Sequence, residues 1–321
     1  MMRLGIIRLG LFAILILLAS AVFAEGDKAC PSAVEQPTAD MIRAVTRSAG
    51  DHGFLWRISK DGHTSYLYGT MHVGKLEWAV PGPSVLQALR ASDTVALELD
   101  MMDEDIRNRI AKGVAALHTM VLPVALEKRM RQQADAVCVP FVSLARLSPE
   151  FQITTLILQD SRWDGLDAQY ATDAVLAGIG HSAKKNMVSL ETPEAQLNLL
   201  QMKDAKETLA FVEENLDEME SGRSRILLKR IADMWSTANY TDMEHYSEWC
   251  DCLNTENEKA LMKRILDDRN PGLAERIDAL HVNGKRVFAA VGSLHMFGPA
   301  GLPLLMSNRG YRVERIEFKP R

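Results

Sequence analysis

Residues 66–74 read YLYGTMHVG, a short apolar run that ends in the motif Gly-x-x-His. Residues 286–298, RVFAAVGSLHMFG, carry the same motif more than 200 residues further along the chain. Aliphatic and aromatic runs of this length favour buried strands. A glycine at the strand end lets the backbone turn sharply or approach a ligand closely. The repeat therefore predicts two strands that bring His72 and His295 to one shared site.

Each motif is followed by the same order of elements. After the first comes a predicted helix with Ser84 as its N-cap, and then a strand over residues 94–99. After the second comes a predicted helix over 298–310 and a final strand over 311–318. This plan is typical of a duplicated β-α-β unit, in which a helical crossover implies parallel strands. We predict an α/β fold with two small sheets, one from each unit.

The remaining segments complete the predicted fold. Runs at 54–59 and 64–68 flank an Asp-Gly dipeptide, which is typical of a hairpin. From about 103 to 285, apolar residues recur mostly every three or four positions, which predicts a large helical middle packed around the sheets. A short strand candidate at 187–191 interrupts this middle and ends in Glu191.

The N-terminal end has the pattern of a signal peptide. Residues 1–24 contain two arginines, an apolar core and small residues before Glu25. The alternative is an uncleaved membrane anchor, although the apolar run is short for the about 20 residues that a span needs. Residues 25–50 predict a flexible lead-in, and residues 51–321 a single domain. We expect an exported protein, periplasmic or secreted, with no stable membrane span after signal removal.

Charge and cysteine content narrow the possible partners. The formal net charge is −5 at pH 7 and no basic stripe stands out, which disfavours nucleic acid as a partner. The even number of cysteines permits disulfides in an exported protein, but sequence does not choose among the pairings of Cys30, Cys138, Cys250 and Cys252. Cys250 and Cys252 are also compatible with a metal site or with free thiols.

Two imidazoles and one carboxylate form a suitable ligand set for a divalent metal. Glu98 is the candidate carboxylate, because an acid within an apolar strand is costly to bury unpaired. It could instead act as a general base on a bound water. The alternative is that the histidines are hydrogen-bonded structural residues and that Glu98 faces solvent. The chain lacks the motifs H-E-x-x-H, G-x-S-x-G and G-x-x-x-x-G-K-[ST], which disfavours zincins, α/β-hydrolases and P-loop enzymes.

Taken together, these motifs resemble the TraB/GumN family. The resemblance covers almost all of the chain after the predicted signal peptide and rests on segments 55–58, 65–74, 98–100, 165–167, 191–196, 269–270, 292–295 and 310–311. The family is similar to the TIKI metalloproteases, in which two Gly-x-x-His motifs and an acidic residue are assigned to the active site. The resemblance implies a divalent metal cofactor, with manganese or cobalt favoured over zinc.

The same resemblance implies roles for particular residues. His72, Glu98 and His295 would form the catalytic and metal-binding set. Supporting or substrate-contacting roles would fall to a second group: Gly69, Glu191, Arg269, Asn270 and Gly292. Asn270 is followed by Pro-Gly, where many relatives have larger residues, so the start of the helix there departs from the family pattern.

From these observations we expect an exported metal-dependent hydrolase of the TIKI-like metallopeptidase kind, acting on a peptide or small-molecule substrate. The alternative is a non-catalytic protein of the cell envelope that binds a peptide or haem, or that serves as an accessory factor. The two histidines distinguish these classes. The hydrolase and the haem-binding protein both require His72 and His295, whereas an accessory factor does not.

Overall fold

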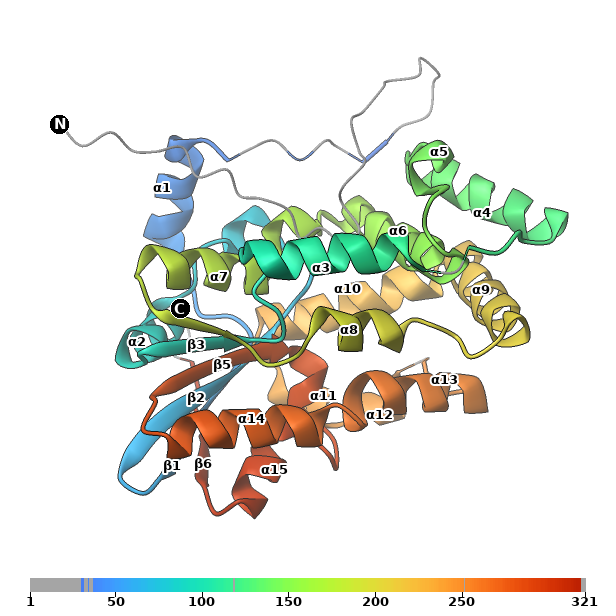
Figure 1. Ribbon diagram of the computed structural model, residues 1–321. Helices are drawn as coiled ribbons and strands as arrows, with labels where there is room; N and C mark the ends of the chain where they lie inside the picture. Colours follow the sequence, from blue (N-terminus) through green and yellow to red (C-terminus); the bar gives the residue numbers. More distant parts are fainter. Residues whose placement is uncertain (1–29, 32–33, 35–36, 118, 251, 319–321) are drawn as a thin grey trace.

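The computed structural model describes residues 30–31, 34, 37–117, 119–250 and 252–318 (Figure 1). The segment assigned to the signal peptide lies outside the described residues. The predicted division into a flexible lead-in, residues 25–50, and a single domain, residues 51–321, stays a prediction.

A hairpin begins the sheet. Strand β1 (Phe54–Lys60) pairs antiparallel with β2 (His63–Thr70), with Lys60 opposite His63. Asp61 and Gly62 between them have φ values of 52° and 78°. Positive φ at both central positions is the geometry that an Asp-Gly turn provides between twisted strands. The hairpin predicted from the sequence is thus confirmed.

The strands form one mixed six-stranded sheet in the order β4-β3-β5-β2-β1-β6. Its other members are β3 (Thr94–Leu97), β4 (Asn186–Ser189), β5 (Val287–Gly292) and β6 (Arg312–Arg315). β2, β5, β3 and β4 are parallel neighbours, whereas β1 is antiparallel to both β2 and β6. The α/β class is confirmed.

The predicted division into two small sheets is wrong. β5 lies between β2 and β3, so the two β-α-β units interleave in a single sheet. Residues Val287–Val291 are all buried, and a strand that is apolar on both faces is most stable with neighbours at both edges. In a separate second sheet, β5 would have had only β6 as a neighbour and one open edge.

Helices connect the strands and cover the sheet (Figure 1). α2 (Pro83–Ala91) joins β2 to β3, and α15 (Leu302–Asn308) joins β5 to β6. α7 (Thr172–Ser182) leads into β4, and α14 (Asn270–Val282) leads into β5. The longer of the remaining helices are α1 (Ala39–Ser48), α3 (Glu104–Ala115), α4 (Val124–Ala136), α6 (Pro149–Asp160), α9 (Ala205–Glu220) and α10 (Arg223–Ser236).

Short helices complete the connections. The short α-helices are α5 (Phe141–Leu144), α8 (Pro193–Leu199), α11 (Tyr240–Glu244), α12 (Tyr246–Trp249) and α13 (Glu256–Met262). Single turns are η1 (Leu76–Trp78), η2 (Ser161–Asp164), η3 (Ala168–Tyr170), the π-helical η4 (Lys263–Asp267) and η5 (Ser293–Met296). The helical middle predicted from periodicity is therefore present, with β4 inside it.

The apolar core has two main parts. The larger surrounds the sheet, and its most deeply buried side chains include Phe54, Leu67, Phe288 and Trp235. A second cluster lies between α4, α6 and α9, which explains how a helical middle remote from the sheet buries its own apolar faces.

Two disulfides join the four cysteines. Cys30 pairs with Cys138, and Cys250 pairs with Cys252. The first ties the start of the described chain to the end of α4. The metal and free-thiol alternatives for Cys250 and Cys252 are wrong, because each sulfur is already bonded.

The N-terminus of α2 is capped from a distance. The predicted N-cap, Ser84, lies inside the helix, which begins at Pro83. The carboxylate of Asp51 instead accepts hydrogen bonds from the backbone N–H of Ser84 at 2.9 Å and of Val85 at 3.1 Å. Sequence pattern finds a cap only when it immediately precedes the helix. Thr192, by contrast, directly precedes α8, and its hydroxyl accepts a hydrogen bond from the backbone N–H of Ala195 at 3.2 Å.

We expect Asp51→Ala to lower the free energy of unfolding by about 1–2 kcal/mol, because it removes both the cap and a favourable charge at the helix N-terminus. Urea unfolding measures the difference. The exposed Asp135 of α4 provides the control, and Asp135→Ala should change stability by less than about 0.5 kcal/mol. Equal losses in the two variants would contradict the capping role.

Candidate functional site

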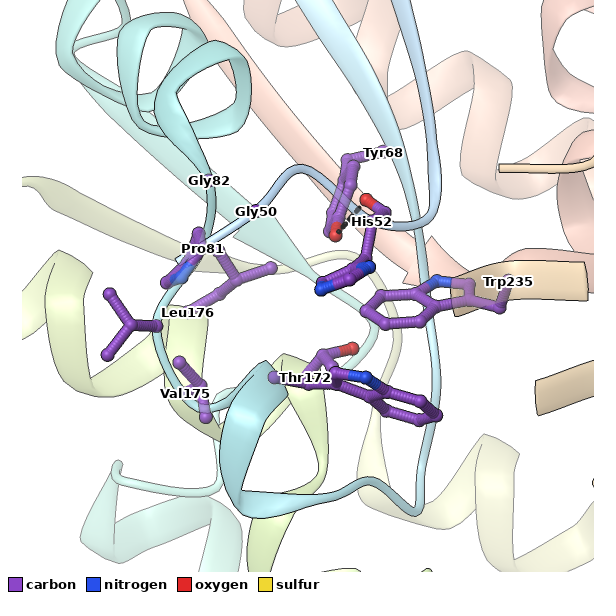
Figure 2. Close-up of a pocket in the computed structure, with 11 residues that line it drawn as sticks. Gly50, His52, Tyr68, Pro81, Gly82, Thr172, Val175, Leu176 and Trp235 are labelled. Atoms are coloured by element: carbon purple, nitrogen blue, oxygen red, sulfur yellow. Dashed lines mark hydrogen bonds between the residues drawn. The ribbon is translucent and has the colours of Figure 1, made fainter. Parts of the chain in front are cut away.

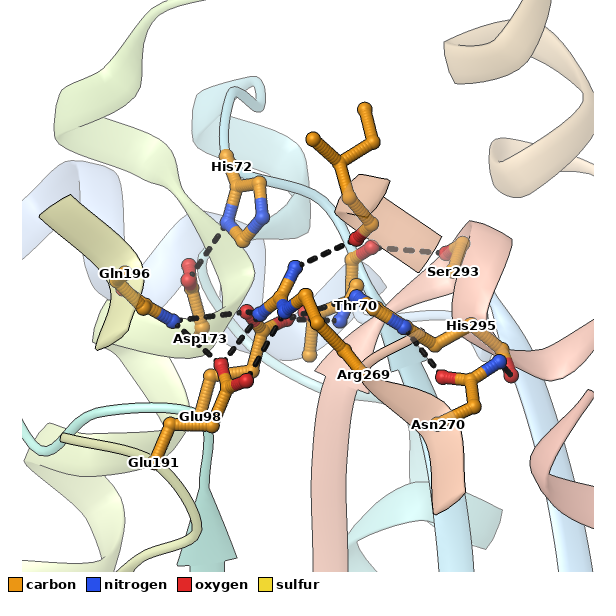
Figure 3. A network of polar contacts seen from close by, with 12 residues as sticks. Thr70, His72, Glu98, Asp173, Glu191, Gln196, Arg269, Asn270, Ser293 and His295 are labelled. Carbon is orange, nitrogen blue, oxygen red and sulfur yellow. Dashed lines mark hydrogen bonds and ion pairs between the residues drawn. The ribbon is translucent and has the colours of Figure 1, made fainter. Parts of the chain in front are cut away.

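The candidate site lies where three neighbouring parallel strands end. His72 follows β2, Glu98 follows β3, and His295 lies in η5, directly after β5. Since β3, β5 and β2 are adjacent and parallel, their carboxyl ends share one edge of the sheet. This is where α/β proteins commonly bind ligands. The structure thus brings together the three residues that the sequence predicted to converge (Figure 3).

Gly292 marks the point around which these side chains gather. A Cβ atom on Gly292 would lie 3.3 Å from Glu98 Oε1, 3.4 Å from His72 Nε2 and 3.6 Å from His295 Cδ2. Any larger residue would place a side chain between the three groups. The missing side chain therefore leaves the room in which they face one another.

Gly69, the glycine of the first motif, lies in close contact with Ser293 and not with the three side chains around Gly292. A Cβ there would lie 3.1 Å from the Cα of Ser293 and 3.0 Å from its Oγ. The hydroxyl of Ser293 donates to the carbonyl of Thr70 at 2.8 Å. Gly69 thus lets the first turn after β5 pack closely on the end of β2, which brings the two motifs together.

His72 has a half-exposed ring held by a carboxylate. Its Nδ1 lies 2.9 Å from Oδ2 of Asp173, in the first turn of α7, and 51% of its side chain is exposed. Burial disfavours the charged ring, but the charge and hydrogen bond of Asp173 outweigh it, with a smaller effect from Glu98. Together they raise the pKa of His72 to about 9. The ring is therefore protonated at neutral pH.

His295 has the opposite character. Its side chain is 3% exposed, and burial lowers its pKa to about 4 despite the nearby Glu98. Nδ1 lies 2.6 Å from Oδ1 of Asn270, whose amide nitrogen donates to the carbonyl of Ala300 at 2.9 Å. Because that amide orientation makes Oδ1 the acceptor, Nδ1 carries the proton. The lone pair on Nε2 then faces Glu98, with 3.9 Å between Nε2 and Oε1.

Arg269 lies between the carboxylates of Glu98 and Glu191 and bonds both. Its guanidinium bonds both Glu98 and Glu191, with 3.0 Å between Nε and Glu191 Oε1. Gln196 donates to both carboxylates, at 3.1 Å to Glu98 and 2.9 Å to Glu191. Burial opposes the charge on Glu98, but Arg269 first, then the two histidines and the N–H of Gly292, hold the pKa of Glu98 well below its usual range. Glu98 therefore stays an anion.

All the residues predicted for the site thus lie in it, and the structure adds others. Asp173 and Gln196 were not assigned to the site. Gln196 lies in segment 191–196, which carries the resemblance, but nothing in the sequence relates Asp173, in the first turn of a helix, to a histidine about 100 residues away. Asn270 lies at the start of α14 with the following proline in the first turn, where a missing N–H costs nothing. The departure from the family pattern therefore leaves the contact between Asn270 and His295 intact.

A small pocket lies behind the first motif (Figure 2). His52, Tyr68, Trp78 and Trp235 line it, and the indole N–H of Trp235 donates to the carbonyl of Gly69 at 2.8 Å. Its interior has room for about one water molecule. We interpret the pocket as a small gap in the aromatic packing that holds the backbone of Gly69 in place, and not as a substrate-binding site.

The residue types at the site, two histidines and a glutamate, are suited to bind a metal, but their side chains are not spaced as metal ligands. Each histidine has its Nδ1 bonded to an oxygen, which is how metal-binding histidines are usually oriented. In the part of the chain that the structure describes, however, no group of three or more His, Cys, Asp or Glu side chains is arranged to hold a metal ion. A metal would require His72 to exchange its proton and Glu98 to bind through Oε1, because Arg269 holds Oε2.

Comparison with known proteins supports the resemblance drawn from the motifs. The model of the TraB/PrgY/gumN family matches residues 54–315. Two similar proteins are both described as "Uncharacterized protein YbaP". The one from Shigella flexneri is 24% identical over 245 residues, which cover 75% of this chain and 87% of the relative. The one from Escherichia coli K12 is 24% identical over 244 residues, with the same coverage. No solved structure matches the chain.

We expect Arg269→Ala to lower the free energy of unfolding by about 3–5 kcal/mol, because it leaves two buried carboxylates facing each other without a cation. Urea unfolding at pH 7 measures the loss. The control is Arg109→Ala, since Arg109 also bonds two carboxylates, Asp105 and Glu194, but at the surface, where such pairs contribute little. A comparable loss in the control would contradict this account.

The lowered pKa of Glu98 predicts a pH dependence of stability. A carboxylate whose pKa is lower in the folded state stabilises the fold at pH values above its unfolded pKa, about 4.3, and the contribution is lost as pH falls further. The wild type should therefore be more stable than Glu98→Gln at pH 6, and the difference in melting temperature should shrink steadily from pH 5 to pH 3. A constant difference across this range would count against a buried anion at Glu98.

Proposed function

This chain belongs to the TraB/PrgY/gumN family, and from its site we propose that it is an exported, divalent-metal-dependent hydrolase that acts on peptide bonds. One observation carries the proposal: His72 Nε2, Glu98 Oε1 and the ring of His295 all lie within 3.6 Å of one point beside Gly292. Two imidazoles and a carboxylate around a space left by a glycine are the donors of a hydrolytic metal site.

In the proposed site, His72, His295 and Glu98 would hold the ion. The resemblance to the TIKI metalloproteases favours manganese or cobalt over zinc, although two imidazoles and a carboxylate are also a ligand set of catalytic zinc. Such an ion, when bound, supplies a Lewis acid for the substrate carbonyl and lowers the pKa of a bound water.

The protein's own contribution is orientation and charge. Asp173 orients the ring of His72, and Asn270 orients that of His295. Arg269 keeps Glu98 ionised and turns its Oε1 toward Gly292, whose N–H donates to it at 2.7 Å. The half-exposed ring of His72 provides the side of the site that a substrate could approach, whereas His295 closes the other side.

Export is supported by the disulfides. Cys30–Cys138 and Cys250–Cys252 are the kind of bond that persists in oxidising compartments such as the periplasm. Among the helices of the described residues, none is both long and apolar enough to cross a membrane.

We expect manganese or cobalt, at about 100 times its dissociation constant, to raise the melting temperature by on the order of 5 °C, because a ligand bound only by the folded state stabilises it. His72→Ala and His295→Ala should each abolish the rise. His245→Ala is the control, since His245 lies at the surface beside Glu248. Differential scanning fluorimetry with manganese, cobalt and zinc makes the comparison, and a peptide-library cleavage assay follows with the best metal.

The outcomes separate the alternatives. Metal stabilisation with cleavage that needs both histidines supports the peptidase. Metal stabilisation without cleavage would favour the non-catalytic binding protein, and a Soret band on adding haem, lost in His72→Ala, would identify haem as its ligand. No metal effect on wild type or variants would refute the metal-dependent hydrolase.

A further inference from the structure

The hydroxyl of Thr70 is a buried polar group that the described residues do not satisfy. Thr70 is 1% exposed, and its Oγ1 has no hydrogen-bond partner among the residues that the structure describes. Its backbone carbonyl, by contrast, accepts a hydrogen bond from Ser293. Thr70 is thus held through its backbone, while its side-chain hydroxyl has no partner among these described residues.

The register of the sheet gives the direction of this side chain. Thr70 on β2 is paired with Gly292 on the parallel strand β5, and paired residues of parallel strands project from the same face. Tyr68, two residues before Thr70, and Phe288, four residues before Gly292, therefore lie on that same face, where their ring centroids are 5.7 Å apart. The hydroxyl of Thr70 therefore lies beside the space at Gly292 that His72, Glu98 and His295 surround, and Figure 3 draws Thr70 between the two histidines.

A hydroxyl buried without a partner destabilises a protein, since it gives up hydrogen bonds to water and receives none in return. Valine has nearly the same shape and would avoid this cost. Native proteins rarely leave such groups unsatisfied, and the exceptions need an explanation. The position next to the gathered donors supplies one, because a ligand in that space would be the missing partner.

We propose that the hydroxyl of Thr70 forms an oxygen-binding subsite, in which Oγ1–H donates a hydrogen bond to a carbonyl or carboxylate oxygen of the ligand. Glu98 already accepts from Gly292, Gln196 and Arg269, and Thr70 Oγ1 makes no hydrogen bond to Glu98 or to His295. The proton of Thr70 is therefore directed to an oxygen that arrives from outside. If the proposed peptidase function holds, that oxygen is the carbonyl of the scissile bond or the carboxylate of the product.

The test compares three variants without any metal. Thr70→Val removes the hydroxyl and keeps the shape, and Thr70→Ser keeps the hydroxyl. Thr94→Val is the matched control, because Thr94 is a fully buried threonine of the same sheet whose hydroxyl donates to Asp93 at 2.9 Å and accepts from Asn186. Acetate is titrated as the smallest carboxylate probe and followed by the NMR signals of the histidine rings. The melting temperature of each ligand-free variant is measured in parallel.

The proposal predicts that stability and binding move in opposite directions. Thr70→Val should keep or raise the melting temperature and weaken acetate binding by about tenfold or more, the effect of losing one hydrogen bond to a charged group. Thr70→Ser should bind acetate within about threefold of the wild type. Thr94→Val should lose stability and bind acetate normally.

Other results would overturn the proposal. These are a loss of stability in Thr70→Val equal to that in Thr94→Val, acetate binding unchanged by the loss of the hydroxyl, or no acetate binding to the wild type. The experiment does not depend on the metal. Acetate binding that requires Thr70, in a protein that metals do not stabilise, would therefore retain the oxygen-binding subsite and reject the metal-dependent hydrolase.

Discussion

The ion pair of Arg269 with Glu98 and Glu191 is the interaction on which the rest of the site depends. The two carboxylates follow the adjacent parallel strands β3 and β4, and their side chains are only 12% and 9% exposed. Two such anions are compatible with burial only when a cation lies between them, and the planar fork of arginine can bond both at once. Because Arg269 directly precedes α14, this ion pair also fixes the start of the helix that delivers Asn270 to His295.

The two Gly-x-x-His motifs are alike in sequence and opposite in chemistry. His72 is half exposed beside a carboxylate, which favours its charged form, whereas His295 is buried beside an amide, which favours its neutral form. Pairs of titratable groups whose surroundings separate their pKa values are a common feature of sites that transfer protons. The duplication of the motif therefore supplies two positions at one edge of the sheet, and the neighbours from α7 and α14 give each position its own character.

Local patterns predicted a good part of this structure. The Asp-Gly turn and the strands that carry both motifs follow from interactions between residues close in the chain. Convergence of His72 and His295 could also be predicted, because the same motif recurs at the end of two strands, and Glu98 was added as the carboxylate at the end of a third strand. The remote cap from Asp51 and the partner Asp173 could not, since they join segments whose spacing in the sequence has no relation to their distance in space.

The sequence by itself determined the α/β class, the family and which residues of the two motifs meet Glu98, because these depend on local periodicity and on motifs that remain recognisable one at a time. Only the tertiary structure decided that the two units interleave in one sheet, since strand order is set by which edges bury the most apolar surface and not by any single strand. It also decided the charge states of His72, His295 and Glu98. Those depend on burial and on partners from α7, α14 and the loop after β4, and a pKa is set by the groups that surround a residue in space.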